Sequence, residues 1–196
     1  MQKIFLAIAC GALSVLASLP ASADEGMWTY HDFPSQAVAE KFGVRIDQTW
    51  LDRVRLGTVR LAGCTASFVS PNGLILTNHH CIESCLAELS TQTDDLIAAG
   101  FLASDRGKER RCETQIADVL VGMVNITSQV DAAVTGKSSQ DANDARKQTL
   151  TQIEQSCDTN SQKDRKTGPL KCQTVNLYNG GQYWLYQYKR YTDIRL

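Results

Sequence analysis

Short runs of alternating apolar and polar residues dominate this chain, a pattern typical of a mainly β fold with helical insertions. Two turn sequences, Pro71-Asn72-Gly73 and Asn179-Gly180-Gly181, separate apolar runs and predict two β-hairpins. A longer run rich in β-branched residues between them predicts one or two more buried strands. The expected strands cover residues 57–61, 64–70, 74–77, 112–126, 175–178 and 182–191.

Helical patterns are confined to a few segments. Amphipathic stretches predict short helices over 36–42 and 47–54, and residues 82–89 could form a helical turn. A capping serine opens the segment 138–157, which predicts a surface helix with a narrow apolar stripe. The polar stretch 158–171, broken by Gly-Pro, predicts a loop.

The N-terminus has the composition of a secretory signal. Lys3 precedes the apolar run 4–19, and Pro20-Ala21-Ser22-Ala23 offers a cleavage site with small residues. The apolar run is shorter than the about 20 residues that a membrane span needs, and no later segment approaches that length. We therefore expect residues 1–23 to be removed, with an uncleaved anchor as the less favoured alternative.

Charge and cysteine use narrow the function classes. The 20 Lys and Arg residues nearly balance the 21 Asp and Glu residues, so no nucleic-acid or membrane-surface partner is indicated. Cys10 leaves with the signal, and the remaining cysteines are Cys64, Cys81, Cys85, Cys112, Cys157 and Cys172. An even number behind a signal predicts disulfides in an oxidising compartment. The sequence does not choose among the pairings, although proximity favours Cys85 with Cys112 and Cys157 with Cys172.

The candidate chemistry lies where the first hairpin ends, in Thr77-Asn78-His79-His80-Cys81. A strand end is a rigid platform, and an imidazole held there suits general-base catalysis. We interpret His80 as that base, and we expect His79, as its strand neighbour, to point to the opposite face in a structural role. A zinc site built from His79, His80, Cys81 and Cys85 is disfavoured, because exported thiols oxidise and paired Cys-x-x-Cys arms are missing.

These residues resemble a known family. A Cys-containing strand followed by Thr77-x-x-His80-Cys81 is similar to the base segment of chymotrypsin-fold serine peptidases. The doubled histidine, the preceding 67–74 segment and Asp24-Glu25-Gly26-Met27-Trp28 more specifically resemble the bacterial periplasmic dipeptidyl-peptidase 7 and 11 family, closely over residues 24–83. The closing segment 191–196 is similar to the segment that shortly precedes the catalytic aspartate in that family.

The resemblance implies a fold and an activity. Residues 24–196 would form the N-terminal part of a trypsin-like serine peptidase domain, an incomplete chymotrypsin-like β-barrel, with 138–157 as the start of an α-helical domain. His80 would be the base of a His-Asp-Ser triad, and Cys64 would pair with Cys81. The complete enzyme would act in the periplasm on peptides, releasing N-terminal dipeptides without a metal or organic cofactor. Whether it forms a homodimer, as family members do, is left open.

The other triad members are not expected within these residues. The family places its aspartate and serine further along than Leu196, and the chain contains no Gly-x-Ser-x-Gly or Gly-Asp-Ser-Gly segment, so Ser67, Ser70 and Ser84 have no nucleophile context. We therefore expect the 196 residues alone to be inactive. The alternatives are a truncated, non-catalytic secreted module that is stabilised by disulfides and binds a peptide or partner, and a truncated gene product with an open strand edge at 194–196.

Overall fold

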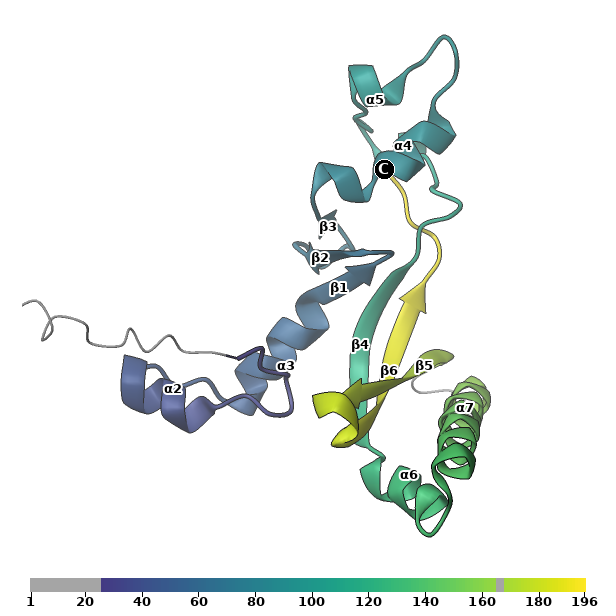
Figure 1. Ribbon diagram of the computed structural model, residues 1–196. Helices are drawn as coiled ribbons and strands as arrows, with labels where there is room; N and C mark the ends of the chain where they lie inside the picture. The colour runs from purple at the N-terminus through teal and green to yellow at the C-terminus, as the bar shows by residue number, and fades with distance from the viewer. Residues whose placement is uncertain (1–25, 165–167) are drawn as a thin grey trace, which may run out of the picture. The chain divides into compact units, whose positions relative to one another are not determined.

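The computed structural model describes residues 26–164 and 168–196 (Figure 1). The expected signal sequence, residues 1–23, lies outside the described residues. The chain divides into two compact units, 1–33 and 34–196. In the described part of the first unit, Asp32 N–H donates to the Thr29 carbonyl at 3.1 Å. Among the described helices, none combines the length and apolarity that crossing a membrane requires.

The second unit contains one antiparallel sheet of six strands in the order β3-β2-β1-β4-β6-β5. Both predicted hairpins are present, as β2–β3 and β5–β6, and the β-branched run forms a single strand, β4. Among the described residues β3 and β5 are the free ends of the sheet, so it is open, as expected for part of a chymotrypsin-like domain. The strands are β1 Thr58–Leu61, β2 Cys64–Phe68, β3 Ile75–Leu76, β4 Ala117–Asn125, β5 Leu170–Leu177 and β6 Gln182–Tyr191.

The predicted helices are present, but two further helices were not predicted and α7 is longer than expected. The described helices are α2 Ser35–Phe42, α3 Gln48–Gly57, α4 Glu83–Leu89, α5 Leu96–Ala99, α6 Thr127–Val134 and α7 Ser139–Lys163. The helices expected near 36–42, 47–54 and 82–89 are confirmed, whereas α5 and α6 were not predicted. The predicted loop 158–171 is wrong at both ends, because α7 continues to Lys163 and β5 already begins at Leu170.

Polar side chains of α7 explain why the helix continues. Three of them accept hydrogen bonds from alternate backbone N–H groups of β5, the last strand of the sheet, which lies beside α7 in Figure 1. The contacts join Glu154 Oε1 to Thr174 N (2.6 Å), Asp158 Oδ1 to Cys172 N (2.7 Å) and Ser161 Oγ to Leu170 N (2.9 Å). The polar residues that suggested a loop therefore cover a strand edge whose donors would otherwise be open to pairing.

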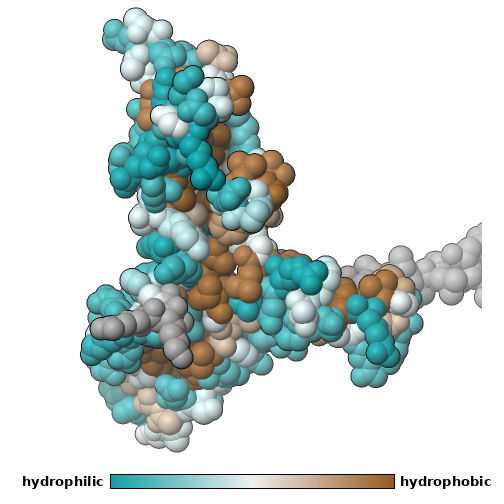
Figure 2. Space-filling view, turned by 180° about the vertical axis from the view of Figure 1, so that it is seen from behind, coloured by the Kyte–Doolittle hydropathy of each residue, from teal (hydrophilic) through white to brown (hydrophobic). Residues whose placement is uncertain are grey.

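Apolar side chains of the second unit form two clusters. The first lies between β1, β2 and β4 and contains Val59, Leu61, Ala66, Cys81, Ala117 and Val119. The second joins α6 to β5 and β6 and contains Ile126, Val130, Cys172, Tyr183 and Leu185. Other large apolar side chains stay exposed, such as Leu74 (64%) and Leu76 (65%) at β3. Figure 2 shows that apolar surface, in brown, gathers in patches on one face of the molecule.

A buried carboxylate, Asp118 on β4, connects three strands. Its side chain is only 3% exposed and accepts hydrogen bonds from Arg60 of β1 (2.9 Å) and from two nitrogens of Arg190 of β6 (2.8 and 2.9 Å). The Arg60 guanidinium also stacks 3.9 Å from the centre of the Tyr188 ring. Burial by itself raises the pKa of Asp118, but the hydrogen bonds and charges of both arginines outweigh it, so that this pKa lies below its ordinary value.

We expect Asp118→Asn to lower the free energy of unfolding by about 2–4 kcal/mol near neutral pH, because two guanidinium groups would then face a neutral amide. Since the pKa of Asp118 is lower in the folded than in the unfolded state, the stabilisation is complete above the unfolded pKa and is lost as the pH falls through the folded pKa. Urea unfolding near neutral pH and below about pH 4 should show that the difference between wild type and variant narrows on acidification. An equal difference at both pH values would contradict this.

Candidate functional site

The β2–β3 hairpin leads the chain to the two histidines. Ser70 Oγ accepts hydrogen bonds from the N–H groups of Asn72 (3.3 Å) and Leu74 (3.1 Å), which closes the turn. Gly73 has φ 88°, in the left-handed region that favours glycine. Local turn chemistry therefore fixes where β3 begins, and with it the position of the residues that follow.

The residues after β3 form a single 3₁₀ turn, His79–Cys81, instead of a continued strand. The N–H of Cys81 donates to the Asn78 carbonyl at 3.1 Å, which closes this turn. His79 and His80 therefore do not alternate across a strand, which corrects the basis of our expectation for His79. The His79 Nδ1 atom lies 3.3 Å from Glu83 Oε1 on the following helix α4, and both side chains are exposed.

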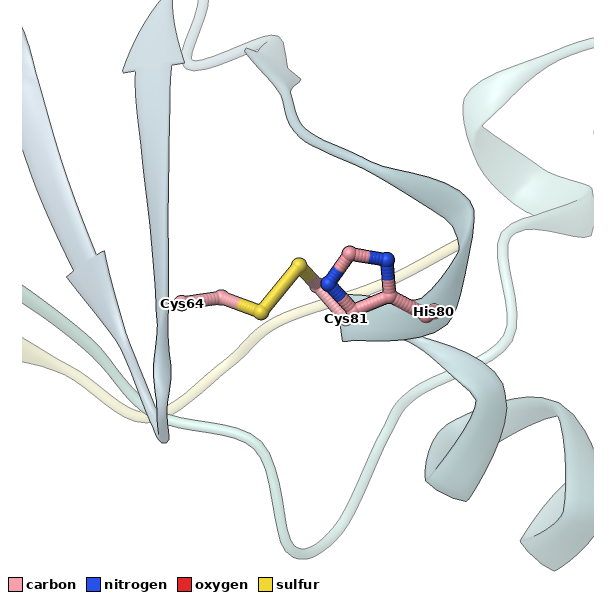
Figure 3. A group of neighbouring side chains, drawn as sticks. All are labelled: Cys64, His80 and Cys81. Carbon is pink, nitrogen blue, oxygen red and sulfur yellow. A yellow bond between two sulfur atoms is a disulfide. The ribbon is translucent and has the colours of Figure 1, made fainter.

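A disulfide between Cys64 and Cys81 connects the turn to the start of β2, with the two Cα atoms 5.9 Å apart. Cys81 is 7% exposed and belongs to the first apolar cluster, whereas His80 is exposed. Figure 3 shows the His80 ring beside this disulfide, and a ring nitrogen lies within 4.8 Å of both sulfur atoms. The backbone next to His80 is thus anchored in the core while its ring remains accessible, as a general base requires.

The other four cysteines in the described part of the chain also form disulfides, and the pairs are those that proximity favoured. Cys85 of α4 joins Cys112, and Cys157 of α7 joins Cys172 of β5. Zinc binds cysteine as a thiolate. Because Cys81 and Cys85 are both oxidised, the alternative zinc site with His79 and His80 loses its sulfur ligands.

Two of the serines near the hairpin, Ser70 and Ser84, have hydrogen bonds that stabilise the local structure. Ser70 closes the turn, and Ser84 Oγ accepts a hydrogen bond from Gln115 Nε2 at 3.3 Å. Within residues 26–164 and 168–196, no hydrogen bond joins a serine hydroxyl to His80. The described residues thus provide a platform for a base without a serine bonded to it.

The segment that resembles the one before the family's aspartate is connected to the histidine turn. Its Ile194 carbonyl accepts the N–H of Cys112 (2.8 Å), and Leu196 exchanges two backbone hydrogen bonds with Arg110 (3.0 and 3.2 Å). The disulfide from Cys112 to Cys85 then reaches α4, which directly follows the turn. Figure 1 shows the C-terminus next to α4. Two segments far apart in sequence are therefore held near each other.

Sequence reasoning did not single out Gln115, which is 6% exposed and donates from Nε2 to the Cys81 carbonyl at 3.3 Å. No motif or spacing marks this residue. The one signal that could have drawn attention to it is its position three residues after Cys112, whose partner Cys85 follows the histidines.

Comparison with known proteins gives relatives over the whole length of the chain. A "Dipeptidyl-peptidase 7" from Capnocytophaga gingivalis is 26% identical over 205 residues, covering 100% of this chain and 27% of the relative. An "Asp/Glu-specific dipeptidyl-peptidase" from Shewanella putrefaciens is 30% identical over 200 residues, covering 96% of this chain and 26% of the relative. The chain thus spans about a quarter of the length of these curated relatives.

Solved structures of Porphyromonas endodontalis DPP11 are similar in fold. The complex with the dipeptide Arg-Asp has a TM-score of 0.71 at 18% identity, covering 89% of this chain and 26% of that chain. The complex with substrate has a TM-score of 0.70 at 18% identity, covering 88% of this chain and 26% of that chain. The family model described as Peptidase S46 matches residues 23–196. The chain therefore belongs to the Peptidase S46 family.

Proposed function

We propose that these residues form the histidine-bearing N-terminal part of a serine-type dipeptidyl-peptidase, an exopeptidase that releases dipeptides from the N-termini of peptides. The observation that carries the proposal is the position of His80. Its ring is accessible at the end of a hairpin, beside the Cys64–Cys81 disulfide, in a chain of the Peptidase S46 family. Relatives over the full length of the chain are named dipeptidyl-peptidases, which supports the same activity.

In this proposal His80 is the general base and later the general acid. It takes the proton of a serine hydroxyl as that oxygen attacks the scissile carbonyl, and it then gives the proton to the leaving amine. An aspartate hydrogen-bonded to the other ring nitrogen would orient the imidazole. Both partners would come from a longer polypeptide, since the curated relatives are about four times the length of this chain. The reaction requires no metal or organic cofactor.

The protein would be exported and act in the periplasm. The N-terminal segment 1–23 and the oxidised cysteines support this location, because disulfides persist in oxidising compartments. Peptides are its proposed substrates. A homodimer of the full enzyme is a further part of the proposal, and sedimentation of the natural gene product would test it.

The gene itself offers a direct test. Reading its DNA past the Leu196 codon is expected to show an aspartate-bearing segment soon afterward and a Gly-x-Ser-Gly-type segment several hundred codons later. The natural product should then release dipeptides from substrates with an unblocked N-terminus, assayed with both acidic and apolar residues in the second position, and a serine-directed fluorophosphonate should inhibit it. A stop codon directly after Leu196 would contradict the proposal and favour a non-catalytic peptide- or partner-binding module.

A further inference from the structure

Gln115 is a buried polar residue whose side chain reaches the histidine turn. It is 6% exposed, and its Nε2 lies 3.3 Å from the Cys81 carbonyl oxygen and 3.3 Å from Ser84 Oγ. The carbonyl oxygen can only accept a hydrogen bond, so the amide nitrogen must face Cys81. Gln115 therefore donates to the residue that directly follows His80.

Three groups of Cys81, its sulfur, its N–H and its carbonyl, each have a bonded partner. Its sulfur is bonded to Cys64, its N–H donates to the Asn78 carbonyl, and its own carbonyl accepts from Gln115. The first two contacts fix the side chain and the N–H of the residue. The peptide that leaves Cys81 is fixed by the third contact together with the N–H of Ile82, which donates to the His79 carbonyl at 3.0 Å. With all three in place, His80 has little freedom beyond rotation of its own side chain.

The oxygen of the Gln115 amide indicates that this residue serves its hydrogen bonds and not packing alone. The Oε1 atom is buried and has no hydrogen-bond partner within the described residues. A buried acceptor left unpaired costs about 1–3 kcal/mol, so an apolar side chain of similar length would satisfy packing at lower cost. The two hydrogen bonds of Nε2 are the contacts that an apolar side chain could not make.

The backbone of Gln115 is itself fixed. Its N–H lies 3.4 Å from the Cys112 carbonyl, and Cys112 is bonded to Cys85 in α4. Gln115 thus reaches the turn from a loop that a disulfide already joins to the helix behind that turn.

We infer that Gln115 is a positioning residue for His80: its amide holds the carbonyl of Cys81, the residue after His80, and so helps to fix the turn that carries the imidazole. The inference rests on the proposed function, because only there does the orientation of His80 affect a reaction. Gln115 acts through the backbone and has no contact with the reacting atoms.

The test compares Gln115→Met, which keeps the length but cannot donate, with Ser84→Ala, which removes the second acceptor of Nε2 and leaves the bond to Cys81. Gln115→Asn, whose amide is too short to reach the carbonyl, serves as a second variant should the methionine variant not fold. All are made in the natural gene product. Two readouts are recorded: kcat and KM for dipeptide release, and NMR relaxation of the His80 ring carbons.

Gln115→Met is expected to lower kcat by roughly 10- to 100-fold with KM nearly unchanged, because a small misplacement of a catalytic group is costly. The His80 ring should show added motion in this variant, whereas Ser84→Ala should resemble wild type in both readouts. Wild-type kcat and ring relaxation in a folded Gln115→Met protein would overturn the inference. A wild-type product without dipeptide release would instead contradict the proposed function, and ring relaxation alone would then decide whether Gln115 fixes His80.

Discussion

Replacing His80 with alanine is expected to lower kcat for dipeptide release by about 10⁴- to 10⁶-fold, since loss of the base from a serine triad removes nearly all of its catalysis. The effect should lie in the chemical step, because that is where the proposed base takes the proton of the serine hydroxyl. Stability should change little, by about 0.5 kcal/mol or less, because His80 is exposed and no hydrogen bond of its ring is found in the described part of the chain.

The measurement is steady-state turnover of a fluorogenic dipeptidyl substrate by the natural gene product, with thermal unfolding as the check on folding. His79→Ala is the matched control, because it removes an adjacent, exposed imidazole from the same turn. We expect kcat of this control to fall by less than about tenfold, since the substitution removes only an exposed contact with Glu83. Comparable losses in both variants, or turnover that survives in His80→Ala, would show that His80 is not the base.

Removing the Cys85–Cys112 disulfide by a double alanine substitution is expected to lower the free energy of unfolding by about 3–5 kcal/mol. The bond closes a loop between residues 27 apart in sequence, which in the chain-entropy model alone contributes about 3.5 kcal/mol. Both cysteines are 0% exposed, so their loss also removes packed sulfur atoms from the interior. The loss of stability should be greatest in α4 and in the loop before β4, because the bond joins these two segments.

Guanidinium unfolding under non-oxidising and non-reducing conditions would measure this. The comparison is a double alanine variant of Cys157 and Cys172, a pair 15 residues apart. Both variants should be destabilised, but only the loss of Cys85–Cys112 should also reduce dipeptide release, because that bond lies next to the histidine turn. A Cys85–Cys112 variant with wild-type stability would contradict the expectation, as would equal losses of activity in the two variants.

Local chemistry explains which parts of the structure the sequence could predict. Both hairpins follow from their turn residues, because Pro-Asn-Gly and Asn-Gly-Gly favour reversals whatever lies around them. The helices α2 and α3 follow from their amphipathic pattern. The accessible imidazole at His80 follows from its place shortly after a short strand, and the expected Cys64–Cys81 disulfide beside it came from the family resemblance.

Tertiary contacts explain what the sequence could not predict. Residues 158–163 are polar in every direction, and they are helical because Asp158 and Ser161 find backbone donors on β5. Gln115 is equally unmarked, because its partners lie 31 and 34 positions away. The turn at His79–Cys81 is closed by local hydrogen bonds, but a long-range bond, the disulfide to Cys64, joins it to β2.

The helix α7 makes the two ends of the sheet unequal. Its side chains occupy the N–H groups of Leu170, Cys172 and Thr174, so a further strand would find three donors of this edge of β5 already bonded. At the opposite end β3 is short, and the apolar side chains of Leu74 and Leu76 remain uncovered. A strand contributed by a longer polypeptide would therefore find an open edge at β3 more readily than at β5. A strand added there would cover the apolar side chains of β3, and the histidine turn, which follows β3 in the chain, would then lie near the added part.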